Sequence, residues 1–146
     1  MSDDCPMCGL NAWKINDLPP RECVYSNEHW RVLVHKSALP GWLVVGLRRH
    51  VGVLNQLTSE EALSLGPVLV GGTQALIDVL GCARSYVMLF CESMPHVHFN
   101  LVPRMEDIPD GFRGAGVFGY DKVSRLLSDP ERDDLGQRLA AAWPKT

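Results

Sequence analysis

The sequence lacks the features by which membrane and secreted proteins are recognised. Its apolar runs, such as WLVVGL at positions 42–47, are far shorter than the roughly 20 residues that a membrane-spanning helix needs. The acidic start, MSDD, has no basic stretch leading into an apolar one, as a secretory signal would. There is no internal repeat and no low-complexity tract. From these absences we expect a cytoplasmic protein with no membrane partner.

An excess of positive charge is also missing. Lys and Arg number 14 against 17 Asp and Glu, which gives a formal net charge of -3. Proteins that bind nucleic acid do so mainly through Lys and Arg contacts to phosphates. We therefore expect no specific nucleic-acid partner, and an anionic substrate would have to be held by a few locally placed donors.

The apolar content that is present suits a single core. The chain has 146 residues, of which 46% are hydrophobic, so we expect one domain over residues 1–146. Runs rich in β-branched and aromatic residues predict about five strands. These runs lie at positions 21–26, 29–36, 42–49, 85–90 and 94–104. Short turns join the first three, so an antiparallel meander is the simplest arrangement.

Between the third and fourth strands the sequence changes to a helical period. Thr58 with Glu61 forms a capping box, and apolar residues then recur at intervals of three and four. We expect this main helix to bend or break near Pro67 and Gly71-Gly72, and to end near Gly81.

The last part of the chain predicts a loop followed by a second helix. Positions 105–120 are rich in Asp, Pro and Gly, which is typical of a loop. Ser128 with Glu131, and Pro130 between them, then opens a short C-terminal helix. The predicted class is therefore α+β, with an antiparallel sheet of about five strands and one main helix across a face.

Cysteine is present in an odd number, which favours reduced thiols in a chain that can form its own core. The five are Cys5, Cys8, Cys23, Cys82 and Cys91. Cys5 and Cys8 form the CxxC motif CPMC. By itself this motif is compatible with a zinc site, a redox pair or two unrelated thiols.

Three polar residues stand at every second position of the apolar stretch MPHVHFNLVPR (94–104). In a strand, His96, His98 and Asn100 would line one face while the apolar residues between them pack on the other. One interpretation is a half-exposed strand whose polar side chains are satisfied by hydrogen bonds. The other is a site of chemistry, which two histidines and an amide in register favour.

The stretch HVHFNLV (96–102) resembles the signature of the histidine triad (HIT) superfamily of nucleotide hydrolases and transferases. That signature is HφHφHφφ, with φ apolar, and every position matches except the third histidine, which is Asn100. LPGWLVVGLRRHV (39–51), LTSEE (57–61) and CPMC (5–8) resemble further family segments in the same order. The resemblance covers about residues 5–104 and implies a HIT-like fold and a small-molecule nucleotide as partner.

The resemblance also implies a structural zinc ion. In zinc-bearing members the metal is held by the CxxC thiolates, the histidine after the basic pair and the first motif histidine. Carried over, these ligands are Cys5, Cys8, His50 and His96. Two thiolates and two imidazoles form a closed tetrahedral set with no open position for water, so such a zinc would stabilise the fold and take no part in catalysis.

By the same resemblance His98 is the catalytic nucleophile. Its imidazole would attack an α-phosphate to give a nucleotidyl-histidine, while the N–H of its other nitrogen donates a hydrogen bond to a backbone carbonyl. Ser93 falls where the family has a phosphate-contacting Ser or Thr. The remaining histidines, His29 and His35, are expected to be surface or strand residues.

Asn100 is the main departure from the family pattern. A histidine there can carry a positive charge, whereas an amide can only donate a neutral hydrogen bond. The related uridylyltransferases have Gln at this place and transfer the nucleotidyl group to an acceptor, so hydrolysis and transfer both remain open.

Two further departures affect the substrate. The acidic residue that many members use on the ribose hydroxyls is missing from VLVHKSALPG (32–41). The usual Gly-Gln before the motif reads Cys91-Glu92. Glu92 would either repel an anion or act on a leaving group.

Three functions therefore remain as alternatives. The first is an enzyme that hydrolyses or transfers nucleoside monophosphoryl groups through His98, on a dinucleoside polyphosphate, a phosphoramidate or a similar compound. The second is a zinc-stabilised nucleotide-binding module with weak or no catalysis because of Asn100. A redox or unrelated role is the third.

The resemblance also implies a homodimer that pairs through the main helix and an edge strand. The apolar stripe Leu65, Leu69 and Leu76, together with SYVMLF (85–90), offers material for such an interface. The alternative is that this stripe only covers its own sheet.

Overall fold

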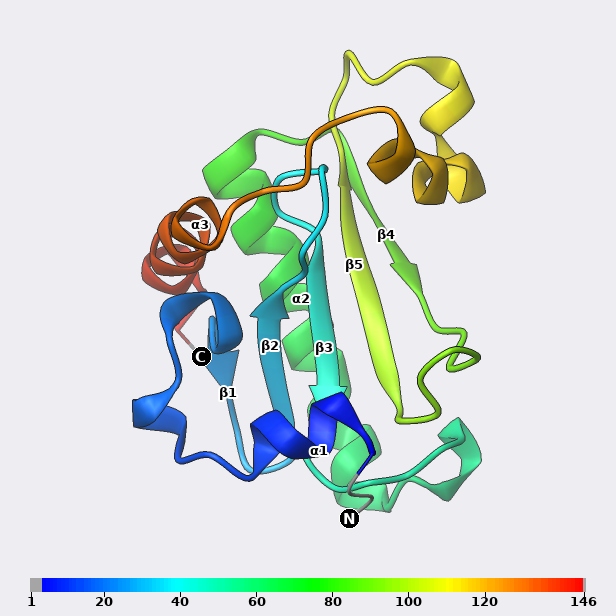
Figure 1. The fold of residues 1–146 in the computed structure, drawn as a ribbon. Coiled ribbons are helices and arrows are strands. Elements are labelled where there is room, and N and C mark those ends of the chain that lie inside the picture. Colours follow the sequence, from blue (N-terminus) through cyan, green and yellow to red (C-terminus); the bar gives the residue numbers. More distant parts are fainter. Residues whose placement is uncertain (1–3, 146) are drawn as a thin grey trace.

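In the computed structural model, which describes residues 4–145, the chain folds around one antiparallel sheet (Figure 1). Its strands are β1 (Tyr25–Ser26), β2 (Trp30–Val34), β3 (Leu43–Leu47), β4 (Arg84–Met88) and β5 (His98–Arg104). Their order across the sheet is β1-β2-β3-β5-β4. The helices are α1 (Pro6–Asn11), α2 (Ser59–Leu80) and α3 (Asp129–Ala142). The predicted α+β class, its five strands and its main helix are confirmed.

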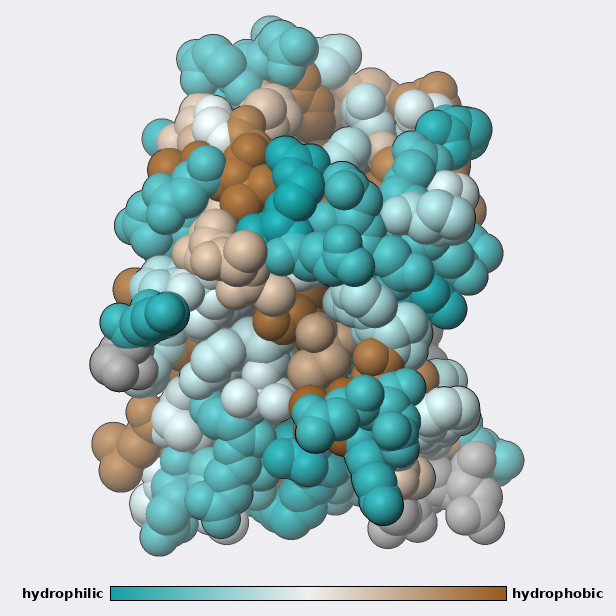
Figure 2. Space-filling view, turned by 90° about the vertical axis from the view of Figure 1, so that its left-hand side faces the viewer, coloured by the Kyte–Doolittle hydropathy of each residue, from teal (hydrophilic) through white to brown (hydrophobic). Residues whose placement is uncertain are grey.

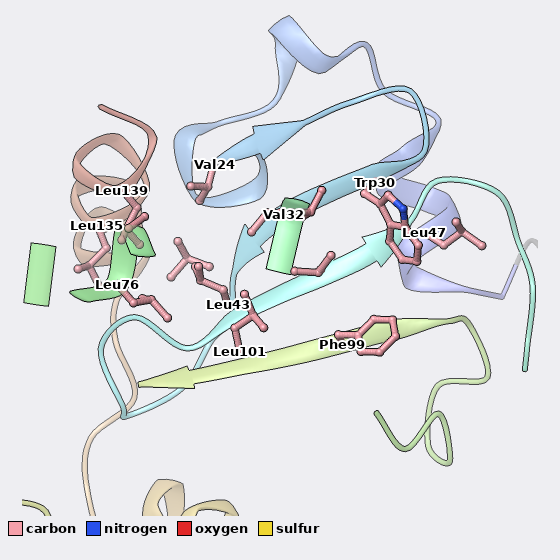
Figure 3. Close-up of a cluster of buried hydrophobic side chains, with 14 of the residues drawn as sticks. Val24, Trp30, Val32, Leu43, Leu47, Leu76, Phe99, Leu101, Leu135 and Leu139 are labelled. Atoms are coloured by element: carbon pink, nitrogen blue, oxygen red, sulfur yellow. The ribbon is translucent and has the colours of Figure 1, made fainter. Parts of the chain in front are cut away.

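Strand alternation gives the sheet one apolar face and one mixed face. Figure 3 shows Leu43, Phe99 and Leu101 directed to the side on which Leu76 of α2 and Leu135 of α3 lie. Figure 1 shows α2 running behind the sheet with α3 beside it. This face is therefore the core, and the alternate residues of β5 must point the other way.

The register between β3 and β5 places the motif residues on the second face. Gly46 pairs with His98, and Val44 pairs with Asn100. Val44 also pairs with Leu33 of β2, so these positions share one side of the sheet. Met7 of α1 lies over Gly46, where an added Cβ would come within 2.7 Å of its sulfur. Helix α1 thus covers one end of this face and leaves His98 and Asn100 beside it.

Helix α2 starts and ends as the sequence predicts. The capping box of Thr58 and Glu61 is formed, and Gly81 ends the helix in the left-handed region with φ 65°. By length and composition α2 would also qualify as a membrane span. Its buried residues, among them Ala75 and Leu76, pack on the sheet, which is the position of a core helix.

The prediction of a break in α2 is wrong, because one continuous helix runs through Pro67 and Gly71-Gly72. The two glycines instead allow close packing against neighbouring side chains. A Cβ on Gly71 would come within 2.9 Å of the Trp143 ring, and one on Gly72 within 2.6 Å of Leu101. Two adjacent glycines therefore let the end of α3 and the sheet approach the helix axis closely.

Several predicted boundaries differ from those observed. The first strand is reduced to Tyr25–Ser26, because Pro20–Glu22 forms a 3₁₀ helix that packs against α3. The expected loop at 105–120 contains two 3₁₀ helices, Asp110–Phe112 and Gly114–Lys122. Strand β5 begins only at His98. His96 therefore precedes the strand and does not line its face as the sequence suggested.

The stripe expected at a dimer interface belongs to the protein's own core. Leu76 is fully buried, and Leu65 and Leu69 pack against the same cluster. The exposed apolar residues of α2 are instead Leu63, Val70 and Ile77, at intervals of seven. On the side of the molecule that carries α3, hydrophilic residues cover most of the surface and interrupt the hydrophobic areas (Figure 2).

Gly136 provides a test of how closely α3 packs on the N-terminal segment. A Cβ at this position would lie 2.4 Å from the backbone oxygen of Pro20. We expect Gly136→Ala to lower the free energy of unfolding by about 1–3 kcal/mol through overpacking. Gly66→Ala is the control, because that helical site is open and alanine should add up to about 1 kcal/mol. Urea denaturation measures the free energy of unfolding of both variants. If both substitutions stabilised the protein, the close contact between Gly136 and Pro20 would be contradicted.

Candidate nucleotide and metal sites

Four side chains from three separate segments meet at one end of the sheet. Cys5 and Cys8 come from the start of α1, His50 from the turn after β3, and His96 from the residues before β5. One ligand atom of each lies within 4.8 Å of all the others. The structure thus brings together the four residues that the resemblance marked as zinc ligands.

The ring of His96 is oriented by the backbone of β3. His96 is fully buried, and its Nε2–H donates to the Leu47 carbonyl at 2.6 Å. Its Nδ1 therefore carries the lone pair and faces the cluster. Burial is the main cause that lowers the pKa of His96, which also favours the neutral ring. Metal-binding histidines are commonly oriented in this way, by a hydrogen bond from the ring nitrogen that does not bind the metal.

The spacing of the cluster matches tetrahedral zinc. Ordinary Zn–N and Zn–S bonds place neighbouring ligand atoms about 3.3 Å apart for two nitrogens and about 3.6 Å apart for nitrogen and sulfur. His50 Nδ1 lies 3.1 Å from His96 Nδ1. Cys5 Sγ and Cys8 Sγ lie 3.4 and 3.6 Å from the same His96 atom. Donor set and distances both fit, so the cluster points to zinc.

Polar contacts hold in place the segments that carry the four cluster residues. Asn11 at the end of α1 donates to the carbonyls of Leu47 and Arg48 at 3.1 and 3.2 Å. Arg49, next to the ligand His50, forms an ion pair with Glu61 at 2.8 Å. The hydrogen bond from Arg49 lowers the pKa of Glu61 to about 2. The capping residue of α2 therefore also anchors the turn that carries His50.

His98 is held in one tautomer by the residue two positions before it. Its Nδ1–H donates to the His96 carbonyl at 2.7 Å. In the neutral ring the lone pair is then on Nε2, the nitrogen on the opposite side. This is the arrangement that a nucleophilic histidine needs, with one nitrogen fixed and the other available.

Two cavities meet at His98. The larger, of about 390 Å³, is here called the apolar cavity. The smaller, of about 260 Å³, is called the aromatic cavity. The two have His35, Ser93, His98 and Asn100 in common. Met7, Leu33 and Val44 contribute apolar surface to the first; Trp42, Phe90 and Phe118 contribute rings to the second.

Trp42 sets the orientation of the Asn100 amide. Its indole Nε1–H donates to Asn100 Oδ1 at 3.0 Å. Because an indole N–H can only donate, the amide oxygen must face it and the amide NH₂ must face away. Trp42 is itself buried, with only 4% of its surface exposed. Asn100 can therefore offer a donor in a defined direction.

The loop before the motif supplies the other predicted substrate residues. Ser93 borders both cavities, and Glu92 borders only the aromatic cavity. Cys91 has φ 56°, the single positive φ of a non-glycine residue between positions 4 and 145. Glycine adopts that conformation without strain, whereas a side chain with a Cβ makes it unfavourable. The loop before the motif is therefore strained at Cys91.

Sequence reasoning missed His35 and Trp42. His35 borders both cavities, whereas the sequence predicted only a surface or strand residue. Burial is the main cause that lowers its pKa, against the opposite effect of Asp121. The only sequence signal for Trp42 is its position just before β3. That position indicates a contact with Asn100 only when β3 is known to pair with β5. His29 lies outside both cavities, beside Glu28, as a surface residue would.

The bond between Trp42 and Asn100 can be tested directly. Asn100→Ala should remove the acceptor, so that the indole N–H of Trp42 exchanges faster with solvent and the free energy of unfolding falls by about 1 kcal/mol. Hydrogen exchange followed by NMR measures this. Trp30 is the internal control, because its indole donates to the Glu61 carbonyl and Ser64 and should be unaffected. Equal exchange of Trp42 in both proteins would contradict the assignment.

Comparison with known proteins rests on structure alone. No protein-family model matches the sequence, and no curated protein matches it. A HIT-like protein from Bartonella henselae, described as involved in cell-cycle regulation, matches with a TM-score of 0.74 and 17% identity. The match covers 97% of this chain and 98% of that one.

Two further solved structures are similar. A zinc-bound histidine triad family protein from Mycobacterium smegmatis has a TM-score of 0.69 and 20% identity, over 96% of this chain and 93% of that one. A uridylyltransferase mutant has a TM-score of 0.66 and 21% identity, over 95% of this chain and 45% of that one. By the arrangement of its strands and helices, the chain has the fold of the histidine triad proteins.

Proposed function

We propose that the protein acts on the α-phosphate of a nucleotide derivative through a covalent nucleotidyl-histidine at His98. The observation that carries this proposal is the fixed His98 ring, whose Nδ1 is bound to the His96 carbonyl at the junction of two cavities. An α-phosphate at this junction would have room for a nucleoside on one side and a second group on the other.

The reaction would take place in two displacements. Nε2 of His98 forms a bond to phosphorus while the bond to the leaving group breaks, and that group departs with the electron pair and takes up a proton. Water or another acceptor then attacks phosphorus. The N–P bond breaks, its electron pair returns to Nε2, and the acceptor releases a proton that replaces the one consumed.

Hydrogen bonds would stabilise the phosphoryl oxygens in both steps. The Asn100 NH₂, directed by Trp42, is one donor, and backbone N–H groups near Ser93 are others. A neutral amide supplies less charge stabilisation than an imidazolium. Nucleotidyl transfer to an acceptor other than water is therefore a second candidate, which the similarity in fold to a uridylyltransferase supports. A binding module without turnover is the third.

We also propose that Cys5, Cys8, His50 and His96 hold a structural zinc ion. The four protein ligands complete a tetrahedral set, so the metal would tie α1 to the sheet and leave no position for substrate. Since these ligands lie far apart in the chain, the metal would contribute directly to the stability of the fold.

Metal analysis tests the zinc site. Protein purified without added metal should contain about one equivalent of zinc per chain. Cys8→Ser should lose most of it and unfold at a lower temperature, whereas Cys23→Ser, outside the cluster, should keep it. Iron in the purified protein, no metal, or a full equivalent in Cys8→Ser would contradict the ligand assignment.

Intact mass measurement tests the nucleophile. After incubation with nucleoside phosphoramidates, the protein should carry an acid-labile nucleotidyl adduct. His98→Ala should abolish adduct and turnover while zinc content and folding remain, and His29→Ala is the matched histidine control. Full turnover in His98→Ala would show that the mechanism is wrong.

The third motif position distinguishes hydrolysis from transfer. Asn100→His should raise hydrolysis by on the order of 10²-fold, because a donor able to carry charge stabilises the phosphoryl oxygens better. If hydrolysis instead stays unchanged or falls, and an acceptor-dependent transfer is lost, the amide protects the intermediate from water and the protein is a transferase.

We propose a homodimer whose interface uses the exposed apolar residues of α2, and not the stripe that the sequence suggested. Leu63 and Val70 are 79% and 69% exposed, and Val87 is exposed on the edge strand β4. Light scattering at micromolar concentration should give twice the 16.2 kDa chain mass. Val70→Glu should give a monomer, whereas Val123→Glu at another exposed apolar site should not. A monomeric mass for the unmodified protein would rule the dimer out.

A further inference from the structure

The aromatic cavity has a composition of its own. Three rings border it: Trp42 just before β3, Phe90 after β4 and Phe118 from the 3₁₀ helix Gly114–Lys122. Phe118 makes edge contacts with Trp42 and with Phe90, each with ring centroids 5.5 Å apart. Phe90 and Phe118 are nevertheless 57% and 42% exposed. Two large rings therefore stand open to solvent beside the candidate nucleophile.

The charged groups of this cavity are all acidic. Glu92 and Asp121 line it, and no Lys or Arg is among the described residues that do. Asp121 is held in place, because its Oδ1 accepts from the Ser37 hydroxyl and the Ala38 N–H, both at 2.7 Å. Burial lowers the pKa of His35, which favours its neutral form. The basic residues Lys36 and Arg132 border the apolar cavity instead, together with Glu22, which is paired with Arg132 at 3.5 Å.

The two cavities therefore suit different halves of a substrate. The apolar cavity, with about 390 Å³, is large enough for a nucleoside and offers apolar surface to a base. The aromatic cavity would then receive the leaving group. Aromatic faces attract organic cations, and nearby carboxylates add Coulomb attraction for the same ligands. A polyphosphate in this cavity would instead meet two carboxylates and no basic side chain.

We infer that the leaving group carries an organic cation, so that the substrate is a nucleoside monophosphoryl compound of a cationic amine or alcohol and not a dinucleoside polyphosphate. This inference rests on the proposed function for its orientation at His98. Glu92, which from the sequence would either repel an anion or act on a leaving group, takes a third role as part of a cation subsite. Phe118 and Asp121 become specificity residues.

The test uses three phosphoramidates that differ only in the charge of the amine. Adenosine and uridine 5′-phosphoramidates of 1,4-diaminobutane, butylamine and 4-aminobutanoate present a cation, a neutral chain and an anion. We expect kcat/KM to fall in that order, by about tenfold or more between cation and anion. Dissociation constants for His98→Ala, which binds without turnover, should follow the same order.

Variants show whether the aromatic cavity causes the preference. Glu92→Gln and Asp121→Asn should each reduce the ratio of cation to anion severalfold, and Phe118→Leu should weaken the cationic compound more than the neutral one. Glu28→Gln, at an exposed carboxylate outside both cavities, should leave the ratio unchanged.

Failure of the inference and failure of the proposed function look different. If adducts form at His98 with equal efficiency from all three compounds, the function stands and the inference is wrong. If no adduct forms but the His98→Ala protein and the unmodified protein both bind the cationic compound preferentially, the subsite is real and the catalytic proposal is wrong. Equal binding together with no adduct would overturn both.

Discussion

The site depends on His96, which connects the core, the cluster with Cys5, Cys8 and His50, and the candidate nucleophile. Its Nε2–H is bound to the Leu47 carbonyl of β3, so its Nδ1 must face the two cysteines and His50. Its own carbonyl accepts the Nδ1–H of His98. Each ring has one nitrogen bound to a backbone carbonyl, so both neutral rings are restricted to single tautomers. A displacement of the His96 ring at the cysteine cluster would therefore also move the His96 carbonyl, to which His98 is hydrogen-bonded.

The alternation of β5 explains how one strand can serve both the core and the candidate site. Phe99 and Leu101 pack in the core, while His98 and Asn100 face the opposite side at the junction of the cavities. Gly46 opposite His98 leaves space for Met7, which lets α1 cover the sheet and contribute the cysteines. The small residue on β3 and the ligand-bearing helix are thus parts of one arrangement.

Local signals in the sequence predicted local structure well. Both capping boxes, at Thr58 and Ser128, form as expected, because their partners lie three residues away. The clustering of Cys5 and Cys8 with two distant histidines followed only from the family resemblance. The bond from Trp42 to Asn100 could not be predicted, since it depends on the register of β3 against β5. The break expected at Gly71-Gly72 does not occur. These glycines instead make room for Trp143, a tertiary contact that local sequence signals do not reveal.

The central claim is that His96 and His98 are held in opposite tautomers by fixed backbone partners. NMR of ¹⁵N-labelled imidazole rings in the zinc-loaded protein measures this directly, because protonated and unprotonated nitrogens have distinct chemical shifts and couplings. We predict a proton on Nε2 of His96 and on Nδ1 of His98, with Nε2 of neutral His98 unprotonated. A proton on Nε2 of neutral His98, or rapid exchange between both tautomers, would contradict the account.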